Sequence, residues 1–427
     1  MHILFFSHYY TPEGNAPATR VSALARRWAR QGHEVTVLTC APNVPDGKVY
    51  AGFRNRLWPQ TEMLDGVRVI RVWTYIAPNK GFTRRIANYL SYLISAVIRA
   101  IFLKAPDVVI ATSPQFFCGW AGVCYATCLR VSRLLRGRPI PFVLEIRDIW
   151  PESIGAVAAM KSSLSMRFLQ WLEIIMYRQA DHIVTVGHGY QRQLVAKGVT
   201  AQRISIIMNG VDKDILSAVD TDPLSVRQQY DLGDAFVCSY IGTIGLACGL
   251  DIVMRAAQTL VERHDQRFKF LIVGDGATRD ELQRRSDEAG LTNVIFTGRQ
   301  PKQRMASFLA ASDVSLVHLI KTPLFETVIP SKIFEALGMR RPIIVGVAGD
   351  ARELVQQSGG GIAIEPENDA QLLEVLDQLR TEPSRCTEMG NSGYEFVNTH
   401  FDRDRLALEY LEILERCVKQ FDRNMAH

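Results

Sequence analysis

The chain has 427 residues, of which 47% are hydrophobic and 22% are charged, proportions that are ordinary for a soluble globular protein. One hydrophobic core seldom extends over so many residues, so the length predicts two domains of roughly 200 residues each. The eight cysteines form no Cys-X-X-Cys pair, and no basic-then-apolar signal opens the sequence. These features argue against a disulfide-stabilised secreted protein and against a metal site, so we expect a cytoplasmic protein.

The charge is divided unevenly between the two halves. Residues 1–210 contain 25 Lys and Arg against 11 Asp and Glu, a net charge of +14, whereas residues 211–427 contain 24 against 33, a net charge of −9. This asymmetry predicts that the first half meets an anionic partner. Because no RNA-stacking motif or recognition-helix module accompanies the charge, we expect an anionic membrane surface and no nucleic acid.

Short apolar runs bounded by turn residues predict the strands of the first half. They occur at residues 3–6, 35–38, 67–72, 108–112, 142–146, 183–186 and 204–208. Helical patterns separate most of these runs, which is typical of a parallel sheet built from strand–helix–strand units.

Two apolar helical segments of this half are candidates for membrane contact. Arg84 and Arg85 precede an apolar run at 86–103, and a second run at 116–129 is followed by Arg130 and three further arginines. The first run is near the lower length limit for a spanning helix, so we expect a crossover helix whose outer face lies on lipid. The alternative is that both helices pack in the core and expose only solvated arginines.

The second half repeats the strand–helix alternation after a polar stretch at 213–234. Strand-like runs occur at residues 236–241, 268–273, 294–297, 314–319, 343–345 and 361–364, and a helical pattern at 403–421 ends the chain. We therefore expect an α/β protein with two Rossmann-like domains, whose parallel sheets face a central cleft. The predicted boundaries are 1–212 and 213–402, with a C-terminal helix in 403–427.

Loops beyond the carboxyl ends of the strands hold the candidate site residues, since ligands of open α/β sheets bind there. Gly14 and Asn15 precede a helix at 20–30. Gly14 permits a close backbone approach, and the N-terminus of a helix attracts anions. The alternative is an ordinary connection with a turn glycine.

A charged cluster, Glu145 to Glu152, follows the run at 142–144. Four charges at a strand end are costly to bury, so they belong in a cleft or in a paired network. Asp148 is the best carboxylate for orienting or deprotonating a hydroxyl, and Arg147 suits a phosphate, unless the two residues form a purely structural pair. His188, flanked by glycines, is a candidate for sugar contact or simply an exposed histidine in a helix-capping loop.

In the second half, the segment Pro330-Ser331-Lys332 begins a helix that places Lys332 and Glu335 on nearly the same face. This pair suits a nucleotide diphosphate, because Lys332 and the backbone N–H groups meet phosphate oxygens and Glu335 accepts from ribose hydroxyls. The alternative is a capping box with Ser331 as the cap. Arg299 is a further basic candidate at a strand end.

In the order and spacing of these motifs, the chain resembles the family 4 glycosyltransferases of the GT-B fold, the branch that builds bacterial O-antigen, capsule and exopolysaccharide and includes N-acetyl-L-fucosamine transferases. The resemblance covers nearly the whole chain. It implies that the last helix crosses back to the first domain and that anomeric configuration is retained. The candidate donor-binding residues are Gly14, Asn15, Gly242, Thr243, Gly274, Arg299, Ser331, Lys332 and Glu335. The candidate acceptor or sugar residues are Arg20, Glu145, His188 and Glu326, and the candidate catalytic residues are Asp148, Lys332 and Arg147.

The chain departs from the family pattern in three places. Many relatives have His-Asp where this chain has Arg147-Asp148, which favours contact with a phosphate over contact with a sugar hydroxyl. Many relatives carry an Arg and a Lys in the loop that here reads Thr243-Ile244 and Ala247-Cys248, so Lys332 is expected to supply the missing cation. The family also places two glutamates eight positions apart. Counting back from Glu335 reaches Thr327, with Glu326 beside it, which predicts a different grip on the donor sugar, as for a deoxysugar.

We therefore expect a metal-independent glycosyltransferase that needs no cofactor and is peripherally bound to the inner face of the cell membrane. Its donor would be a UDP-sugar, carrying an N-acetylated deoxyhexose such as L-FucNAc, and its acceptor a glycan on a polyprenyl diphosphate. One alternative is a non-hydrolysing UDP-sugar epimerase, which would have no use for apolar basic helices. Another is a non-catalytic sugar-nucleotide-binding partner of a polysaccharide assembly complex.

Overall fold

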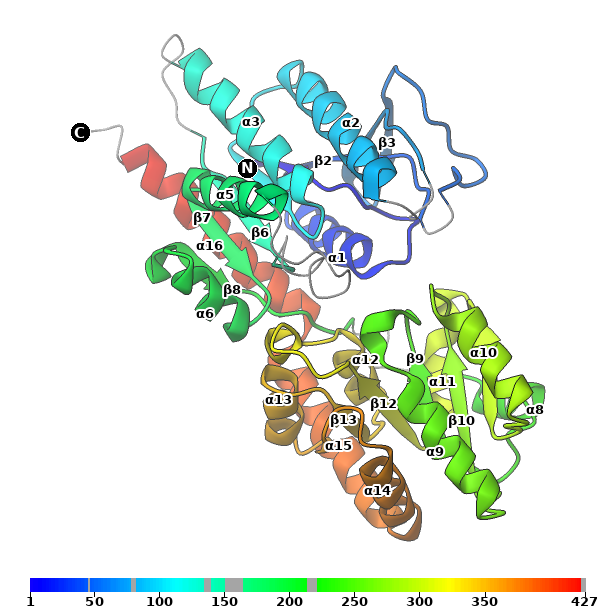
Figure 1. Ribbon diagram of the computed structural model, residues 1–427. Coiled ribbons are helices and arrows are strands. Elements are labelled where there is room, and N and C mark those ends of the chain that lie inside the picture. The colour runs from blue at the N-terminus through cyan, green and yellow to red at the C-terminus, as the bar shows by residue number, and fades with distance from the viewer. Residues whose placement is uncertain (45–46, 78–81, 134–139, 150–163, 213–220, 424–427) are drawn as a thin grey trace. The chain divides into compact units, whose positions relative to one another are not determined.

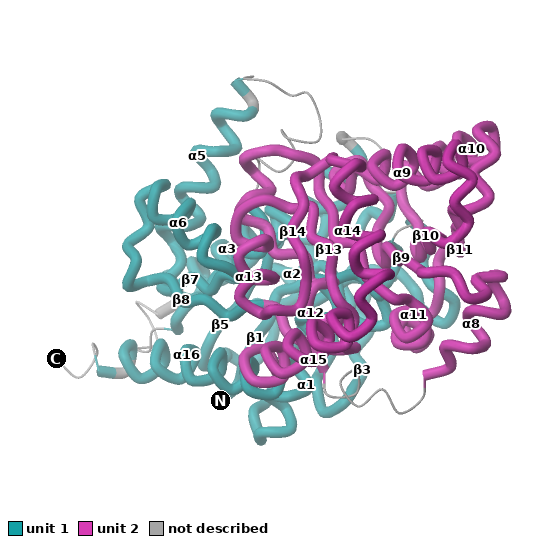
Figure 2. Tube along the Cα trace, turned by 90° about the horizontal axis from the view of Figure 1, so that it is seen from below, with its two compact units in different colours: residues 1–208, 404–427 teal, residues 209–403 magenta. Residues whose placement is uncertain are grey.

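The computed structural model describes residues 1–44, 47–77, 82–133, 140–149, 164–212 and 221–423 (Figure 1). The chain divides into two compact units, one made of residues 1–208 with 404–427 and the other of residues 209–403 (Figure 2). Each unit has one sheet with helices packed against it, which is the α/β organisation that the sequence predicts.

The sheet of the first unit has the strand order β3-β4-β2-β1-β5-β6-β7-β8. Its strands are β1 His2–Phe6, β2 Glu34–Cys40, β3 Gln60–Leu64, β4 Val67–Val72, β5 Val108–Thr112, β6 Phe142–Ile146, β7 His182–Thr185 and β8 Ile204–Ile206. All neighbours are parallel except β3, which pairs antiparallel with β4. No apolar run predicts β3, because this edge strand buries none of its side chains.

The helices of the first unit cover both faces of this sheet. They are α1 Ala16–Arg30, α2 Phe82–Ile101, α3 Phe116–Arg133, α5 Leu164–Gln179, α6 His188–Ala196 and α16 Arg403–Arg423. On one face, α1 packs against α16: the Trp28 Nε1–H donates to the Ala407 carbonyl at 2.8 Å, and the Trp28 ring meets Tyr410 edge-on. The C-terminal helix therefore belongs to the core of the first unit.

On the other face, α3 lies close to the sheet and contacts both α2 and α5 (Figure 1). A Cβ at Gly122 would lie 2.5 Å from the Phe142 ring, and one at Gly119 would lie 2.5 Å from the Met176 sulfur. At Gly122 the rigid Phe142 ring leaves no room for a side chain, whereas at Gly119 the flexible Met176 side chain would have to shift. None of the described helices is long and apolar enough to cross a bilayer.

The second unit has a fully parallel sheet with the strand order β11-β10-β9-β12-β13-β14. Its strands are β9 Phe236–Ile241, β10 Phe268–Val273, β11 Val294–Gly298, β12 Val314–His318, β13 Ile343–Gly346 and β14 Gly361–Ala363. Its helices are α8 Pro223–Gln229, α9 Asp251–Glu262, α10 Arg279–Glu288, α11 Met305–Ala311, α12 Lys332–Gly338, α13 Asp350–Ser358, α14 Asp369–Thr381 and α15 Pro383–His400.

The two segments that connect this unit to the rest of the chain lie side by side. The Val211 N–H donates to the Phe401 carbonyl at 2.9 Å, and the Arg403 N–H donates to the Val211 carbonyl at 3.1 Å. Arg403 also forms an ion pair with Asp212, and both side chains are nearly buried. The chain thus enters and leaves the second unit through one fixed pair of strand-like segments.

Candidate functional site

The candidate residues of the first unit follow neighbouring strands. Gly14 and Asn15 come after β1, Arg147 and Asp148 after β6, and His188 after β7, and the sheet order β1-β5-β6-β7 places these strand ends along one edge. Because carboxyl ends of parallel strands share an edge, the structure brings these loops together on the side where α/β sheets bind ligands.

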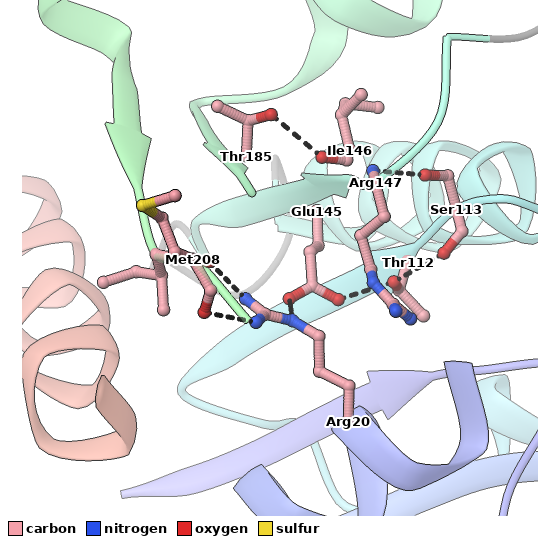
Figure 3. Close-up of polar contacts among 9 residues, drawn as sticks. Arg20, Thr112, Ser113, Glu145, Ile146, Arg147, Thr185 and Met208 are labelled. Atoms are coloured by element: carbon pink, nitrogen blue, oxygen red, sulfur yellow. Dashed lines mark hydrogen bonds and ion pairs between the residues drawn. The ribbon is translucent and has the colours of Figure 1, made fainter. Parts of the chain in front are cut away.

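Arg20 and Glu145 form a buried ion pair at this edge (Figure 3). The Arg20 Nε donates to the Glu145 carboxylate at 2.9 Å, and its terminal nitrogens donate to the carbonyls of Ile207 and Met208 at 2.8 and 2.9 Å. The Thr112 hydroxyl donates to the second carboxylate oxygen of Glu145 at 2.6 Å. This network joins α1 to β5, β6 and the end of the β8 segment, so both charges hold the site edge together.

The charge state of Glu145 follows from this network. The side chain is fully buried, and burial alone would raise the carboxyl pKa, but the positive charges of Arg20 and Arg147 and the bond from Thr112 lower it overall. Glu145 is therefore ionised at neutral pH. A depressed pKa also means that this carboxylate stabilises the fold at neutral pH and that the contribution is lost as the pH falls below its ordinary value.

Asn15 and His188 occupy the beginnings of two helices. The Asn15 side chain accepts a hydrogen bond from the Ala18 N–H at 2.9 Å and so caps α1, while Gly14 before it is exposed, with no atom within 4 Å of where a Cβ would lie. His188 is the first residue of α6 and is exposed. The loop after β1 thus exposes the backbone of Gly14 at the sheet edge, and the loop after β7 exposes the His188 side chain.

Arg147 and Asp148 come directly after β6 and are half-buried. The Arg147 N–H donates to the Ser113 hydroxyl at 2.7 Å, which ties this segment to the end of β5. Asp148 lines a small, mostly apolar cavity together with Gln115 and Tyr177. The remainder of the predicted charged cluster, including Glu152, lies outside the described residues.

In the second unit, the predicted residues also share one sheet edge. Gly242 and Thr243 follow β9, Gly274 follows β10 and Arg299 follows β11, and the helix α12 follows the neighbouring strand β12. Arg299 and Thr243 are exposed there. The edge therefore offers backbone groups and one arginine in addition to α12.

The glycines of this edge permit two loops to touch. Gly242 and Gly274 have φ angles of 146° and 144°, and a Cβ at Gly274 would lie 1.9 Å from the Gly242 carbonyl oxygen. The Ile244 N–H donates to the Asp275 carbonyl at 3.0 Å, which fixes the two loops to each other. Any larger residue at 274 would force these loops apart.

Lys332 lies under the first of these loops. Its Nζ is 3.6 Å from the centroid of the Tyr240 ring, a cation–π distance, and a Cβ at Gly242 would lie 3.1 Å from the same nitrogen. The Tyr240 hydroxyl in turn donates to the Thr243 carbonyl at 2.7 Å. Tyr240 thus positions both the loop and the lysine, and sequence reasoning missed it because a tyrosine in a buried strand looks like core.

Burial lowers the pKa of the Lys332 ammonium to about 8. Within the part of the chain that the structure describes, no carboxylate forms an ion pair with Lys332. The lysine is therefore still mostly protonated at neutral pH, and its charge is available to an anionic ligand.

Ser331 does not cap α12, and Glu335 on the same helix has a raised pKa. The Ser331 side chain makes no capping hydrogen bond to α12, so the capping-box alternative is wrong. Burial raises the pKa of the Glu335 carboxyl, and the charges of Arg403 and Lys302 oppose this rise. The negative charge of Asp212 adds to the rise, so Glu335 lies half-buried among charges of both signs. Its carboxylate oxygens can accept hydrogen bonds.

The two departures from the family pattern that lie in the second unit have structural counterparts. Ile244 is fully buried in the core of the second unit, so a basic side chain at that position would have to leave it. Glu326 is exposed in a short 3-10 turn, Phe325–Thr327, and its carbonyl lies 2.1 Å from where a Cβ on Gly349 would be. The contact with Gly349 fixes the backbone of this turn.

His318 is a further residue that sequence reasoning missed. It is fully buried at the end of β12, where its Nε2 accepts from the Glu367 N–H at 2.8 Å and its Nδ1 lies 2.7 Å from the Cys248 carbonyl. Since Nε2 accepts, Nδ1 must carry the proton and donate. His318 therefore connects the loop after β9 to the segment before α14. Gly249 and Gly346 lie against its ring, and these glycines were the sequence feature that could have indicated a buried ring at this position.

The described residues hold no group of three or more His, Cys, Asp or Glu side chains that could bind a metal ion. The sequence has three Asp-X-Asp triplets, at residues 212–214, 220–222 and 402–404, and one aspartate of each is engaged with the protein. Asp212 forms an ion pair with Arg403. Asp404 accepts from Arg27 at 2.6 Å, and Asp222 caps α8 by accepting from the Ser225 N–H at 2.9 Å.

Comparisons with known proteins agree with this architecture. Two family models match, a glycosyl transferase 4-like domain over residues 15–210 and glycosyl transferases group 1 over residues 225–396. The chain is 24% identical over 421 residues to the putative colanic acid biosynthesis glycosyl transferase WcaI of Escherichia coli K12, covering 96% of this chain and 99% of that protein.

Solved structures show the same fold. Anabaena HepE in complex with UDP-glucose matches with a TM-score of 0.71 and 18% identity, covering 97% of this chain and 100% of that chain. WaaG, a glycosyltransferase involved in lipopolysaccharide biosynthesis, matches with a TM-score of 0.67 and 16% identity, covering 96% and 99%.

We predict that Glu145→Gln lowers the free energy of unfolding by about 3 to 5 kcal/mol, because it leaves the buried Arg20 charge without its carboxylate. Urea unfolding at neutral pH measures the change. Glu281→Gln is the matched control, since the Arg284 partner of Glu281 is exposed, and its midpoint should stay close to that of the parent. Equal midpoints for both variants would contradict the structural role of Glu145.

Proposed function

As this chain belongs to the family 4 glycosyltransferases of the GT-B fold, which act in polysaccharide biosynthesis, we propose that its donor is a UDP-sugar and its acceptor a glycan carried on a polyprenyl diphosphate. The observation that carries the donor assignment is the charge of Lys332 under the Gly242 loop. The UDP and UDP-glucose complexes of HepE, which has the same fold, support a nucleotide-sugar donor.

Lys332 would meet the donor diphosphate. Its ammonium lies at the sheet edge where α/β proteins bind nucleotides, beneath backbone groups that only glycine keeps open. The electron-rich face of Tyr240 keeps the cation in place without neutralising it, as a carboxylate would. Glu335 on the same helix would accept hydrogen bonds from the ribose hydroxyls of UDP.

In the reaction, the bond between the sugar C1 and the diphosphate oxygen breaks, and a bond from C1 to an acceptor hydroxyl oxygen forms. UDP leaves with increased negative charge, which the Lys332 ammonium stabilises more strongly than it stabilises the bound donor. The acceptor proton passes to the diphosphate oxygen or to Asp148, the carboxylate that we assign to orient the acceptor hydroxyl. We expect retention of configuration and no metal ion.

The donor sugar is proposed to be an N-acetylated deoxyhexose such as L-FucNAc. The position eight residues before Glu335 is Thr327, and the neighbouring Glu326 is exposed. A sugar without the usual hydroxyl has less need of a glutamate there. Of the two alternatives, the comparisons favour neither the epimerase nor the silent binding partner, because the relatives reported above are glycosyltransferases.

The helix α2 would hold the enzyme on the membrane. Its exposed side chains include Leu90, Ile94, Ile98 and Ile101, which recur at helical spacing along one face and continue into Phe102, which is 76% exposed. Such an apolar stripe is typical of helices that lie in the membrane interface. The second predicted segment differs: most apolar residues of α3 are buried, and Arg130 pairs with Asp181 at 2.7 Å, so α3 itself is largely core.

The helix α5 adds a second exposed apolar face that sequence reasoning missed. Phe168 and Trp171 are each 56% exposed and stack with their ring centroids 5.8 Å apart, and Leu164 before them is 85% exposed. Aromatic residues of this kind favour the boundary between lipid and water. The two helices α2 and α5 both contact α3 (Figure 1).

We predict that Lys332→Met lowers turnover by roughly 100-fold to 1000-fold, the cost of removing one preorganised charge from the leaving group, with a smaller effect on donor affinity. Methionine keeps an unbranched chain over Tyr240, so the fold should persist. Turnover is measured as UDP release with a lipid-linked acceptor in excess chelator.

Lys321→Met is the matched control, since Lys321 is an exposed lysine of the same unit. It should keep near-parental turnover. A folded Lys332→Met enzyme that turns over as fast as the Lys321→Met enzyme would remove Lys332 from the active site.

For the membrane, we predict that the double change Ile94→Asp and Ile98→Asp weakens binding to anionic liposomes by about 10-fold or more, because two charges replace apolar groups that would enter the interface. Co-sedimentation measures the bound fraction. Leu408→Asp, on the exposed side of α16, serves as the control and should leave binding unchanged. Equal loss in both variants would show that α2 is not the docking helix.

A further inference from the structure

His318 is a buried polar side chain that the proposed chemistry does not use. It is the last residue of β12, and it is fully buried. Because β12 lies next to β9 in the sheet, the ring is beside the loop that follows β9, residues 242–249. A buried imidazole needs hydrogen-bond partners for its nitrogens, so the partners show which segments the ring connects.

Both ring nitrogens bond to backbone groups of segments that are distant in sequence. The Nδ1–H donates to the Cys248 carbonyl at 2.7 Å, and Nε2 accepts from the Glu367 N–H at 2.8 Å. A Cβ on Gly249 would lie 3.1 Å from the ring Cε1, and one on Gly346 would lie 2.5 Å from Cδ2. The ring therefore fits closely between two glycines, and its orientation fixes the position of the Cys248 carbonyl.

Other carbonyl groups of the loop after β9 also accept hydrogen bonds from the protein. The Thr243 carbonyl accepts from the Cys248 thiol at 3.1 Å, and the Ala247 carbonyl accepts from the Ile320 N–H at 3.0 Å. A carbonyl oxygen carries a partial negative charge and repels phosphate, whereas backbone N–H groups attract it. A loop that meets a diphosphate must therefore turn its carbonyls toward the protein, and the bond from His318 does this for Cys248.

The His318 ring does this without adding charge beside Lys332. Burial lowers the pKa of the ring, and the positive charges of Arg255 and Lys332 lower it further, against the opposing effects of the Cys248 carbonyl and of Glu367. An imidazolium would carry a proton on Nε2 and would lose the bond from the Glu367 N–H. The ring is therefore neutral, with one donor and one acceptor in fixed places.

We propose that His318 is a positioning residue for the donor: its Nδ1–H holds the Cys248 carbonyl, and with it the loop 243–249, in the conformation that meets the diphosphate. The bond from the Glu367 N–H anchors the other side of the ring and does not touch the loop. This inference rests on the proposed function, because it takes the donor diphosphate to lie against this loop. The two nitrogens thus have different effects, which substitutions can separate.

Asparagine and glutamine at position 318 each keep one of the two bonds. The amide nitrogen of asparagine takes the place of Nδ1 and donates to the Cys248 carbonyl, whereas the amide oxygen of glutamine takes the place of Nε2 and accepts from the Glu367 N–H. His318→Asn should therefore hold the loop, and His318→Gln should release it. Each variant leaves one backbone group without its partner, so both should lower the melting temperature.

Calorimetry with UDP measures the effect on the donor site. His318→Asn should bind UDP as the parent does, and His318→Gln should bind it about 10-fold more weakly, the loss expected for one hydrogen bond. The donor KM of His318→Gln should rise by a similar factor while kcat changes little. The reason is that the loop meets the diphosphate in the bound donor and in the transition state alike.

Leu379→Ala is the control for a loss of stability alone. Leu379 is fully buried in the core of the second unit, near the end of α14. The next residue, Arg380, lies over the ring of Phe268 at the beginning of β10, so this part of the core is at the opposite edge of the sheet from the loop. The variant should have a lower melting temperature and parental UDP affinity.

Alkylation of Cys248 by iodoacetamide, followed by mass spectrometry of the peptides, reports on the loop without any donor. The rate should rise in His318→Gln and stay parental in His318→Asn, because the thiol bonds to the Thr243 carbonyl only while the loop keeps its conformation. The exposed Cys128 thiol is the internal reference and should react equally in all variants.

The outcomes separate this inference from the proposed function. Equal UDP affinities for His318→Asn and His318→Gln would overturn the inference. So would a Leu379→Ala protein that loses as much UDP affinity as His318→Gln, since UDP binding would then follow stability. A folded parent that binds no UDP would refute the proposed donor, and the alkylation rates of Cys248 would then decide alone whether His318 holds the loop.

Discussion

Lys332 holds its ammonium 3.6 Å from the centroid of the Tyr240 ring, and the features of the second unit that bear on function surround this contact. Tyr240 fixes the loop above through its hydroxyl bond to Thr243, and the glycines at 242 and 274 keep that loop open. A carboxylate partner would hold the lysine equally well but would cancel its charge. An aromatic partner leaves the charge for a phosphate, which is why we place the donor here.

The first unit combines a buried ion pair at its sheet edge with helices whose outer side chains are exposed. The buried pair of Arg20 and Glu145 joins α1 to the strand ends, and α16 closes the core behind them. On the opposite face, α2 and α5 expose apolar stripes that no described segment covers. These exposed apolar side chains are the observation that supports the proposed contact with a membrane.

Most strands could be predicted because buried parallel strands are continuous apolar runs. The strand β3 could not be predicted, because an exposed edge strand has no continuous apolar run. The loops that carry the candidate residues could be predicted from the same pattern, because they follow the ends of the predicted strands. The residues that contact those candidates could not be predicted. That Tyr240 supports Lys332, or that Glu145 meets Arg20 across 125 positions of sequence, depends on contacts between distant segments, which spacing along the chain cannot reveal. The exposed face of α5 was missed because an apolar pattern alone does not say which side is covered.

The central claim is that the Lys332 ammonium is the cation that meets the diphosphate. Nuclear magnetic resonance of the ¹³C-labelled lysine ε-carbons, with the Lys332 signal assigned by its loss in Lys332→Arg, reports the pKa of this group directly. The account predicts a pKa of about 8 in the free protein, because burial disfavours the charge, and a rise on addition of UDP, because the diphosphate favours it. A Lys332 titration that UDP leaves unchanged, at UDP concentrations that saturate the protein, would contradict the claim.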